Sequence, residues 1–149
     1  MTLAFRPMGP LPEAELWRGA LVRARDTLGR ELLQLRDDLP HVAGAGCWSL
    51  FGGGVEAGET LEGAARREFA EETGIALAPG DLVPLARAGA TAKPGGVLYV
   101  FDCTRALAPG AVRLGEGAGF GFLTPAQVDA WPLLPQIRSL LQNQRDRAP

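Results

Sequence analysis

The sequence contains little cysteine, a single histidine and no long apolar run. Cys47 and Cys103 are too few for a disulfide-stabilised scaffold, so we expect a reduced, intracellular protein. No apolar run of about 18 residues or more occurs, which leaves no candidate for a transmembrane helix. The sequence also shows no secretion signal and no lipidation motif. From these absences we expect a cytoplasmic protein that does not bind a membrane.

Neither sign of charge dominates. The chain has 15 Lys and Arg residues against 17 Asp and Glu residues, and a net charge of −2 gives no electrostatic reason to expect nucleic-acid binding. Its apolar fraction of 46% over 149 residues is typical of a globular chain with one core. We therefore expect a single domain over residues 1–149, with an N-terminal arm at 1–13 and a frayed tail at 146–149.

The most informative stretch is residues 53–75, GGVEAGETLEGAARREFAEETGI. Thr60 is a suitable N-cap and Gly74 a suitable C-terminal cap, which predicts a helix over residues 61–73. An apolar face begins this helix and a carboxylate face continues it one turn later. The apolar face holds Leu61, Ala64 and Ala65, and the carboxylate face holds Glu68, Glu71 and Glu72.

Three carboxylates on one helix face repel one another unless a cation neutralises them. A cluster of oxygen ligands favours a hard divalent ion, Mg²⁺ or Mn²⁺, over zinc. The alternative is a solvated acidic patch on a surface helix. Arg66 and Arg67 beside the cluster, and the glycine-rich loop before the helix, favour a site over a simple surface patch.

This stretch resembles the signature of the Nudix hydrolases. The signature is Gly, five residues, Glu, seven residues, Arg-Glu, an aliphatic residue, one residue, Glu-Glu, one residue, Gly and an aliphatic residue. The matching positions are Gly53, Glu59, Arg67, Glu68, Phe69, Glu71, Glu72, Gly74 and Ile75. Phe69 departs from the usual aliphatic residue, and Phe51 stands where the family usually has Pro.

The resemblance implies an α+β fold, the α/β/α Nudix sandwich, in which helices flank a mixed β-sheet and the signature forms a loop-helix-loop. It also implies roles for the residues. Glu71 and Glu72 would be metal ligands, and Glu68 a ligand or the general base, with the carbonyl of Gly53 completing the metal shell. Glu59 and Arg67 would form an ion pair that orients the cluster. Glu116 would add a carboxylate from a later loop, and the choice of base between Glu68 and Glu116 stays open.

The resemblance further implies Mg²⁺-dependent or Mn²⁺-dependent hydrolysis of a diphosphate bond in a nucleoside diphosphate derivative. A chain of this length most resembles the nucleoside triphosphate pyrophosphohydrolases. ADP-ribose, a dinucleoside polyphosphate or a nucleotide sugar is the alternative substrate. Two other classes are a non-catalytic Nudix-fold binding module and an isopentenyl diphosphate isomerase-like enzyme. Since Nudix hydrolases are often dimers, a homodimer is the expected partner arrangement, with a strand around residues 3–6 as the candidate contact.

Substrate contacts are harder to assign from the sequence. Trp48 and Tyr99 are candidates to stack on a base, although aromatic residues on strands belong more often to a core. Arg36 and Lys93 are candidates to contact phosphate. The single histidine, His41, lies in a predicted loop, where a solvated side chain is the usual role.

The remaining pattern predicts strands at 16–25, 30–36, 47–51, 81–89 and 97–103. A short amphipathic helix is the alternative for residues 30–36, but its short length between turn signals favours a strand. Residues 112–123, with Glu116, are predicted as a loop. Thr124-Pro125-Ala126-Gln127 predicts the start of a short helix that ends at about Trp131, and 136–145 predicts a final helix.

Overall fold

The computed structural model describes residues 4–147. A central sheet of five strands has the order β1-β6-β7-β2-β5 and mixes parallel with antiparallel pairs. Its strands are β1 (Arg6–Met8), β2 (Trp17–Arg23), β5 (Phe51–Gly54), β6 (Leu82–Gly89) and β7 (Gly96–Cys103). A second, antiparallel sheet has the order β4-β3-β8, from β4 (Trp48–Ser49), β3 (Glu31–Leu35) and β8 (Gly119–Leu123).

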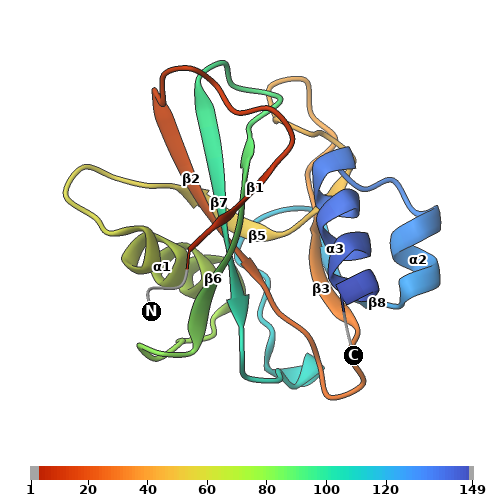
Figure 1. Cartoon of the computed structure of the whole chain (residues 1–149). Coiled ribbons are helices and arrows are strands. Elements are labelled where there is room, and N and C mark those ends of the chain that lie inside the picture. The colour runs from red at the N-terminus through yellow and green to blue at the C-terminus, as the bar shows by residue number, and fades with distance from the viewer. Residues whose placement is uncertain (1–3, 148–149) are drawn as a thin grey trace.

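Three α-helices flank these sheets: α1 (Leu61–Thr73), α2 (Pro125–Ala130) and α3 (Pro135–Arg147), with a short 3₁₀ helix at Pro109–Ala111. In Figure 1, α1 lies on one side of the central strands, and α3 with α2 lies on the other. No helix within residues 4–147 is long and apolar enough to cross a membrane.

The alternation of side chains along β2 explains why a core lies on each face of the central sheet. Ala20 and Val22 belong to the core under α1, whereas Leu21 between them belongs to the core under α3. Successive side chains of a strand point to opposite faces, so one buried strand supplies both cores. The predicted α/β/α sandwich with a mixed sheet is therefore confirmed.

The apolar run at 97–103 forms β7, which pairs with β2 on one side and with β6 on the other. A register shift between Pro84 and Ala86 interrupts the pairing of β6 with β7, because proline inside a strand cannot donate a ladder hydrogen bond. Residues 31–35 form a strand, so the helical alternative for this segment is excluded.

Three predicted boundaries were wrong. The predicted single strand at 47–51 is two strands in different sheets, because the chain leaves the second sheet after Ser49 and enters the central sheet at Phe51. The predicted loop at 112–123 contains β8, which a complete ladder with β3 stabilises despite its glycines. The final helix begins at Pro135 and continues to Arg147, so residues 146–147 of the predicted frayed tail are helical, and 148–149 lie outside the described residues.

The strand predicted around residues 3–6 is displaced. It runs over Arg6–Met8 and pairs in parallel with β6 of the same chain. Residue 3 of the predicted strand lies outside the described residues. The arm therefore adds a strand to its own sheet, which removes this strand as the argument for a homodimer.

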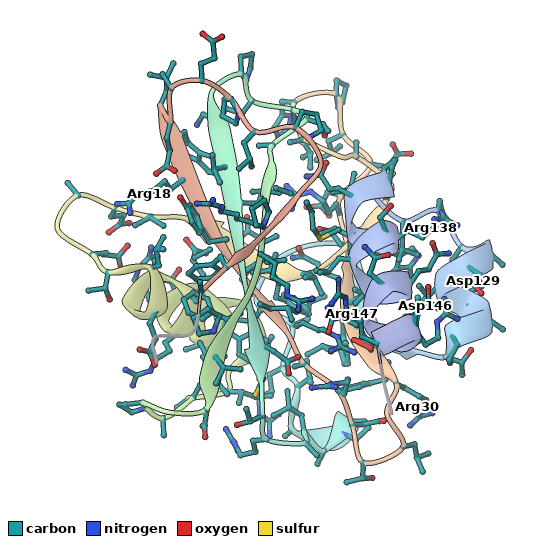
Figure 2. The ribbon with its side chains drawn as sticks, in the orientation of Figure 1. Arg18, Arg30, Asp129, Arg138, Asp146 and Arg147 are labelled. Carbon is teal, nitrogen blue, oxygen red and sulfur yellow. The ribbon has the colours of Figure 1, made fainter. Side chains whose placement is uncertain are left out.

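The corner between α2 and α3 is held by arginines. Helix α2 begins at the predicted start, where Thr124 and Gln127 form a capping box. Arg138 donates to the carbonyl oxygens of Asp129 and Trp131 at the end of α2, the second at 2.8 Å. Figure 2 labels Arg138 and Asp129 at this corner. Arg145 donates to the Asp129 carboxylate at 2.6 Å, so α2 and α3 are tied along two turns of α3.

Candidate active site

Helix α1 begins and ends at the predicted caps. The Thr60 hydroxyl accepts a hydrogen bond from the Gly63 N–H at 3.0 Å, and Gly74 has a φ of 73°, a conformation that glycine adopts without strain. Ala64 and Ala65 are fully buried and Leu61 packs against the same core. The apolar half of the helix therefore anchors it on the sheet, as predicted.

The two departures from the Nudix pattern contact each other. Phe69 of α1 and Phe51 of β5 are both fully buried, and their rings meet edge to face with centroids 6.2 Å apart. This geometry is favourable for aromatic rings. Phe51 precedes Gly52 and Phe69 follows Glu68, so the pair lies directly behind residues of the candidate site.

Three of the four predicted carboxylates line one cavity of about 470 Å³, which we name the acidic cavity. Glu68 and Glu72 reach it from α1, and Glu116 reaches it from the loop before β8. The other lining residues are Gln34, Arg36, Asp37, Leu39, His41, Val42, Ala43, Gly52, Gly53 and Gly117. Glu71 does not line this cavity: its side chain is 59% exposed and lies 3.4 Å from Arg67 Nη1.

Glu72 is the most enclosed of these carboxylates. It is 4% exposed, and one of its oxygens accepts the backbone N–H of Gly52 at 2.9 Å. Gln34 Nε2 lies 3.4 Å from the other oxygen. Burial raises the pKa of Glu72 to about 7, and the charges of Glu68 and Glu116 act in the same direction. The pKa of Glu68 is also raised by burial, against the opposing effect of Arg67.

Two glycines position Glu116. A side chain at Gly115 would lie 2.3 Å from the carbonyl oxygen of Glu71, and the Gly115 N–H donates to the Glu72 carbonyl at 2.9 Å. Gly117 has a φ of 96°, and a Cβ there would lie 2.7 Å from Gln34 Nε2. Gln34 Nε2 also donates to the Glu116 carbonyl at 2.9 Å. The loop can therefore approach α1 and Gln34 closely only because glycine flanks Glu116 on both sides.

Gly53 makes a similar close approach. A Cβ at Gly53 would lie between 2.5 and 2.7 Å from the carboxylate atoms of Glu68. The absence of a side chain at this position is therefore what allows Glu68 to lie against the backbone of β5. The predicted role of the Gly53 carbonyl as a metal ligand stays a prediction.

The ion pair predicted between Glu59 and Arg67 is present. Arg67 Nε and Nη2 donate to the two Glu59 oxygens at 2.7 and 2.9 Å, and Nη2 also donates to the Gly54 carbonyl at 3.1 Å. Hydrogen bonds from Arg67 lower the pKa of Glu59 to about 2. Arg67 Nη1 contacts Glu68 at 3.0 Å. One guanidinium thus links the glycine-rich loop, strand β5 and a carboxylate of the cavity.

The residues of the acidic cavity fit a hard divalent cation in their chemistry. Their donors are oxygens, and neither Glu72 nor Glu116 takes part in a salt bridge among residues 4–147. A cation would offset the repulsion of carboxylates that converge without such partners. In the same described residues, however, no group of three or more His, Cys, Asp or Glu side chains is already close enough to hold a metal ion. The carboxylates share a cavity, and a metal would have to draw them together.

A second cavity of about 480 Å³ adjoins the first and shares Arg36, Ala43, Gly52 and Gly53 with it. We name it the apolar cavity. Its apolar walls are Trp17, Leu21, Leu50, Leu98 and Leu134, and its polar lining includes Ser49, Thr91, Lys93 and Gln136. The two adjoining cavities thus form a hollow that is acidic at one end and apolar at the other.

Of the four predicted substrate contacts, two line a cavity and two do not. Arg36 lines both cavities and its Nε donates to the Ala43 carbonyl, and Lys93 lines the apolar cavity. Trp48 and Tyr99 line neither. Trp48 packs against Trp131, with ring centroids 5.4 Å apart. Tyr99 bonds to Glu15, and its ring meets Phe5 in an edge contact on the α1 side of the sheet.

Several lining residues were not predicted. Gln34 had a weak signal, because it is the polar residue inside a strand otherwise rich in leucine, and it is 3% exposed. Trp17, Ser49 and Gln136 had no signal, because their neighbours in the cavity are distant in sequence. His41 does line the acidic cavity, where it is exposed on the loop after β3.

A family model described as the NUDIX domain matches residues 16–144. Among solved structures, the MutT protein from Methanosarcina mazei Go1 is similar with a TM-score of 0.73 and 25% identity, covering 92% of this chain and 99% of that one. A MutT NUDIX hydrolase from Burkholderia pseudomallei is similar with a TM-score of 0.68 and 28% identity, covering 85% and 95% of the two chains.

Two curated relatives are similar over shorter segments. An oxidized purine nucleoside triphosphate hydrolase from Danio rerio is 59% identical over 34 residues, which is 23% of this chain and 22% of that protein. The nucleoside triphosphatase NudI from Salmonella arizonae is 54% identical over 39 residues, 26% of this chain and 28% of that protein. The chain thus matches less than a third of either relative. The family model and the structural similarity, in contrast, cover most of the chain, and the chain belongs to the Nudix hydrolase family.

Proposed function

We propose that this protein is a metal-dependent pyrophosphohydrolase whose substrate is a nucleoside triphosphate or a closely related nucleotide. The observation that carries the proposal is the hollow formed by the two adjoining cavities, which share four lining residues. Its acidic end has the donors for a metal-bound diphosphate, and its apolar end has the size and lining for a nucleoside. The names of the two curated relatives, both triphosphate hydrolases, support the same substrate class.

Glu68, Glu72 and Glu116, with the Gly53 carbonyl, would hold Mg²⁺ or Mn²⁺ at the acidic end. Glu71 is a further ligand on the proposal, and its exposed side chain would have to leave Arg67 and turn toward the cavity. Bound there, the divalent ion would offset the negative charge of the phosphate oxygens and lower the pKa of a coordinated water.

Other residues of the chain would orient the metal ligands and neutralise the phosphate charge. Gly52 N–H and the Gln34 amide fix the Glu72 carboxylate, so this group is positioned as a ligand. Arg36 stands where the phosphate chain would pass from one cavity to the other, and its guanidinium suits a phosphate oxygen.

In the reaction, a water oxygen forms a bond to one phosphorus of the anhydride, and the bridging P–O bond breaks. The proton of the water passes to a carboxylate, Glu68 or Glu116. Both line the cavity and neither is committed as firmly as Glu72 to backbone hydrogen bonds. Replacing each by Gln separates the roles: the base variant would retain metal affinity but lose the acidic limb of its pH–rate profile.

The proposal is tested by incubating the protein with Mg²⁺ or Mn²⁺ and a panel of nucleotides. The panel covers deoxynucleoside and oxidised deoxynucleoside triphosphates, ADP-ribose, dinucleoside polyphosphates and nucleotide sugars, with products separated by anion-exchange chromatography. We expect cleavage of a nucleoside triphosphate that stops when EDTA is added. Cleavage of no compound would overturn the proposal and favour a binding module, and cleavage of ADP-ribose alone would move the substrate to the alternative class.

A further inference from the structure

The Trp17 ring packs against glycines of three strands. A Cβ at Gly19 of β2 would lie 2.8 Å from the indole ring, one at Gly96 of β7 would lie 3.1 Å from it, and one at Gly54 of β5 would lie 3.5 Å from it. Any side chain at the first two positions would displace the ring. Three neighbouring strands thus leave room for one aromatic side chain, which is half-buried and lines the apolar cavity.

Lys93 lies over this ring. Its ammonium is 4.5 Å from the ring centroid, a distance typical of a cation–π contact. The hairpin loop between β6 and β7 holds Lys93 in place, because Ala90 N–H donates to the Gly96 carbonyl at 2.8 Å and Gly96 N–H donates to the Lys93 carbonyl at 2.9 Å. Trp17 and Lys93 therefore form one prepared surface on the wall of the apolar cavity.

This surface lies in the apolar cavity, where the base of a bound nucleotide would lie. The acidic cavity takes the phosphates under the proposed function, and Arg36, Gly52 and Gly53 connect it to the apolar cavity. A nucleotide with its phosphates among Glu68, Glu72 and Glu116 would place its nucleoside in the apolar cavity. Aromatic rings stack on the π-face of any base, and an ammonium donates hydrogen bonds but accepts none.

We propose that Trp17 and Lys93 form the base-recognition surface of this protein, with Trp17 stacking on the base and Lys93 donating to a carbonyl oxygen on its edge. The inference rests on the proposed function. When the base lies on Trp17, the ammonium moves from the ring to the edge of the base. Guanine carries a carbonyl where adenine carries an amino group, and the two rings have the same size, so this surface favours guanine nucleotides over adenine nucleotides.

The test is calorimetric titration with dGMP and dAMP, which bind without turnover. The wild-type protein is expected to bind dGMP more tightly than dAMP. Trp17→Leu should weaken both by at least about fivefold, the lower end of the stacking contribution of one base. Lys93→Met should bring the two affinities together by weakening dGMP alone. Trp131→Leu is the matched control, because Trp131 packs on Trp48 outside both cavities, and it should bind both nucleotides as the wild type does.

The variants test the role of Trp17 and the role of Lys93 separately. Equal binding by Trp17→Leu and Trp131→Leu would overturn the stacking role, and an unchanged preference in Lys93→Met would overturn the role of Lys93. Absence of monophosphate binding by the wild type would overturn the inference as a whole. If circular dichroism shows that Trp17→Leu is unfolded, Lys93→Met still tests the inference, because Lys93 lies on an exposed loop. Failure of the proposed function is distinguishable, because it shows as no cleavage in the nucleotide panel whatever the monophosphate affinities are.

Discussion

The acidic cavity is lined by three carboxylates, whereas the apolar cavity beside it is lined by Trp17 and leucines and carries few charges. The first is electrostatically strained, since burial raises the pKa of Glu72 to about 7. The second is lined mainly by apolar side chains and carries only the charges of Arg36 and Lys93. Under the proposed function, hydrolysis and base recognition therefore rest on different contacts, even though Gly52, Gly53 and Arg36 line both cavities.

The largest effect is expected from Glu72→Gln. The carboxamide keeps an oxygen that accepts the Gly52 N–H, so the fold should survive, but the charge that would hold a divalent cation is lost. We expect turnover to fall at least about 100-fold, measured as steady-state kcat with saturating Mg²⁺. Glu62→Gln is the matched control, because Glu62 lies in the first turn of the same helix and lines neither cavity. Similar losses in the two variants would contradict the assignment of chemistry to the acidic cavity.

A second comparison uses neighbouring glycines that lie against different side chains, Gly53 against Glu68 and Gly54 against Trp17. Neither Gly53 nor Gly54 has a positive φ, so the backbone accepts alanine at both positions. A Cβ at Gly53 would lie 2.5 Å from the Glu68 carboxylate carbon, whereas a Cβ at Gly54 would make ordinary contact with Trp17 at 3.5 Å. We expect Gly53→Ala to lower kcat about tenfold or more by displacing Glu68. Gly54→Ala should act mainly on KM and by less. Equal changes of kcat in both variants would show that the two cavities do not divide these tasks.

The two cavities also differ in how much of each could be predicted from the sequence. Helix α1, its caps at Thr60 and Gly74 and its carboxylates follow from local spacing, because a helix places residues three and four apart on one face. That Glu68 and Glu72 share a cavity could therefore be expected, and Glu116 followed from the resemblance to a family. Spacing could not show that Glu71 turns away toward Arg67, since this depends on the helix's neighbours.

The apolar cavity could not be predicted in the same way. Trp17 of β2, Lys93 of the β6–β7 loop and Gln136 of α3 are far apart in the sequence, and only the tertiary fold brings them together. Tyr99 shows the same limit: it lies on β7 beside Leu98, but strand alternation places it on the opposite face from the cavity. Strand β8 was missed because its glycines have low strand propensity, and pairing with β3 outweighs that preference.

A third prediction concerns stability without metal. The pKa of Glu72 rises from its usual 4.5 to about 7 in the folded protein, so the folded state binds this proton more tightly than the unfolded state. This contribution to stability is fully present below about pH 4.5 and is lost as the pH rises through about 7. In EDTA, Glu72→Gln should therefore gain stability relative to the wild type between pH 5 and pH 8, as measured by urea unfolding. A difference that stays constant over this range would contradict the buried, electrostatically strained carboxylate, and Mg²⁺ should reduce the gain by stabilising the wild type.

The smallest effect is expected in the core behind the candidate site, at the contact of two phenylalanines. Phe51 and Phe69 touch there edge to face, at residues where the Nudix pattern usually has Pro and an aliphatic residue. A double-mutant cycle with Phe51→Leu and Phe69→Leu should give a coupling free energy of about 0.5–1.5 kcal/mol, measured by urea unfolding. Because neither ring lines a cavity, kcat and the dGMP affinity should change by less than about threefold. A coupling near zero would mean that each phenylalanine is accommodated independently, and a selective loss of kcat would mean that the pair positions Glu68 rather than supporting both cavities alike.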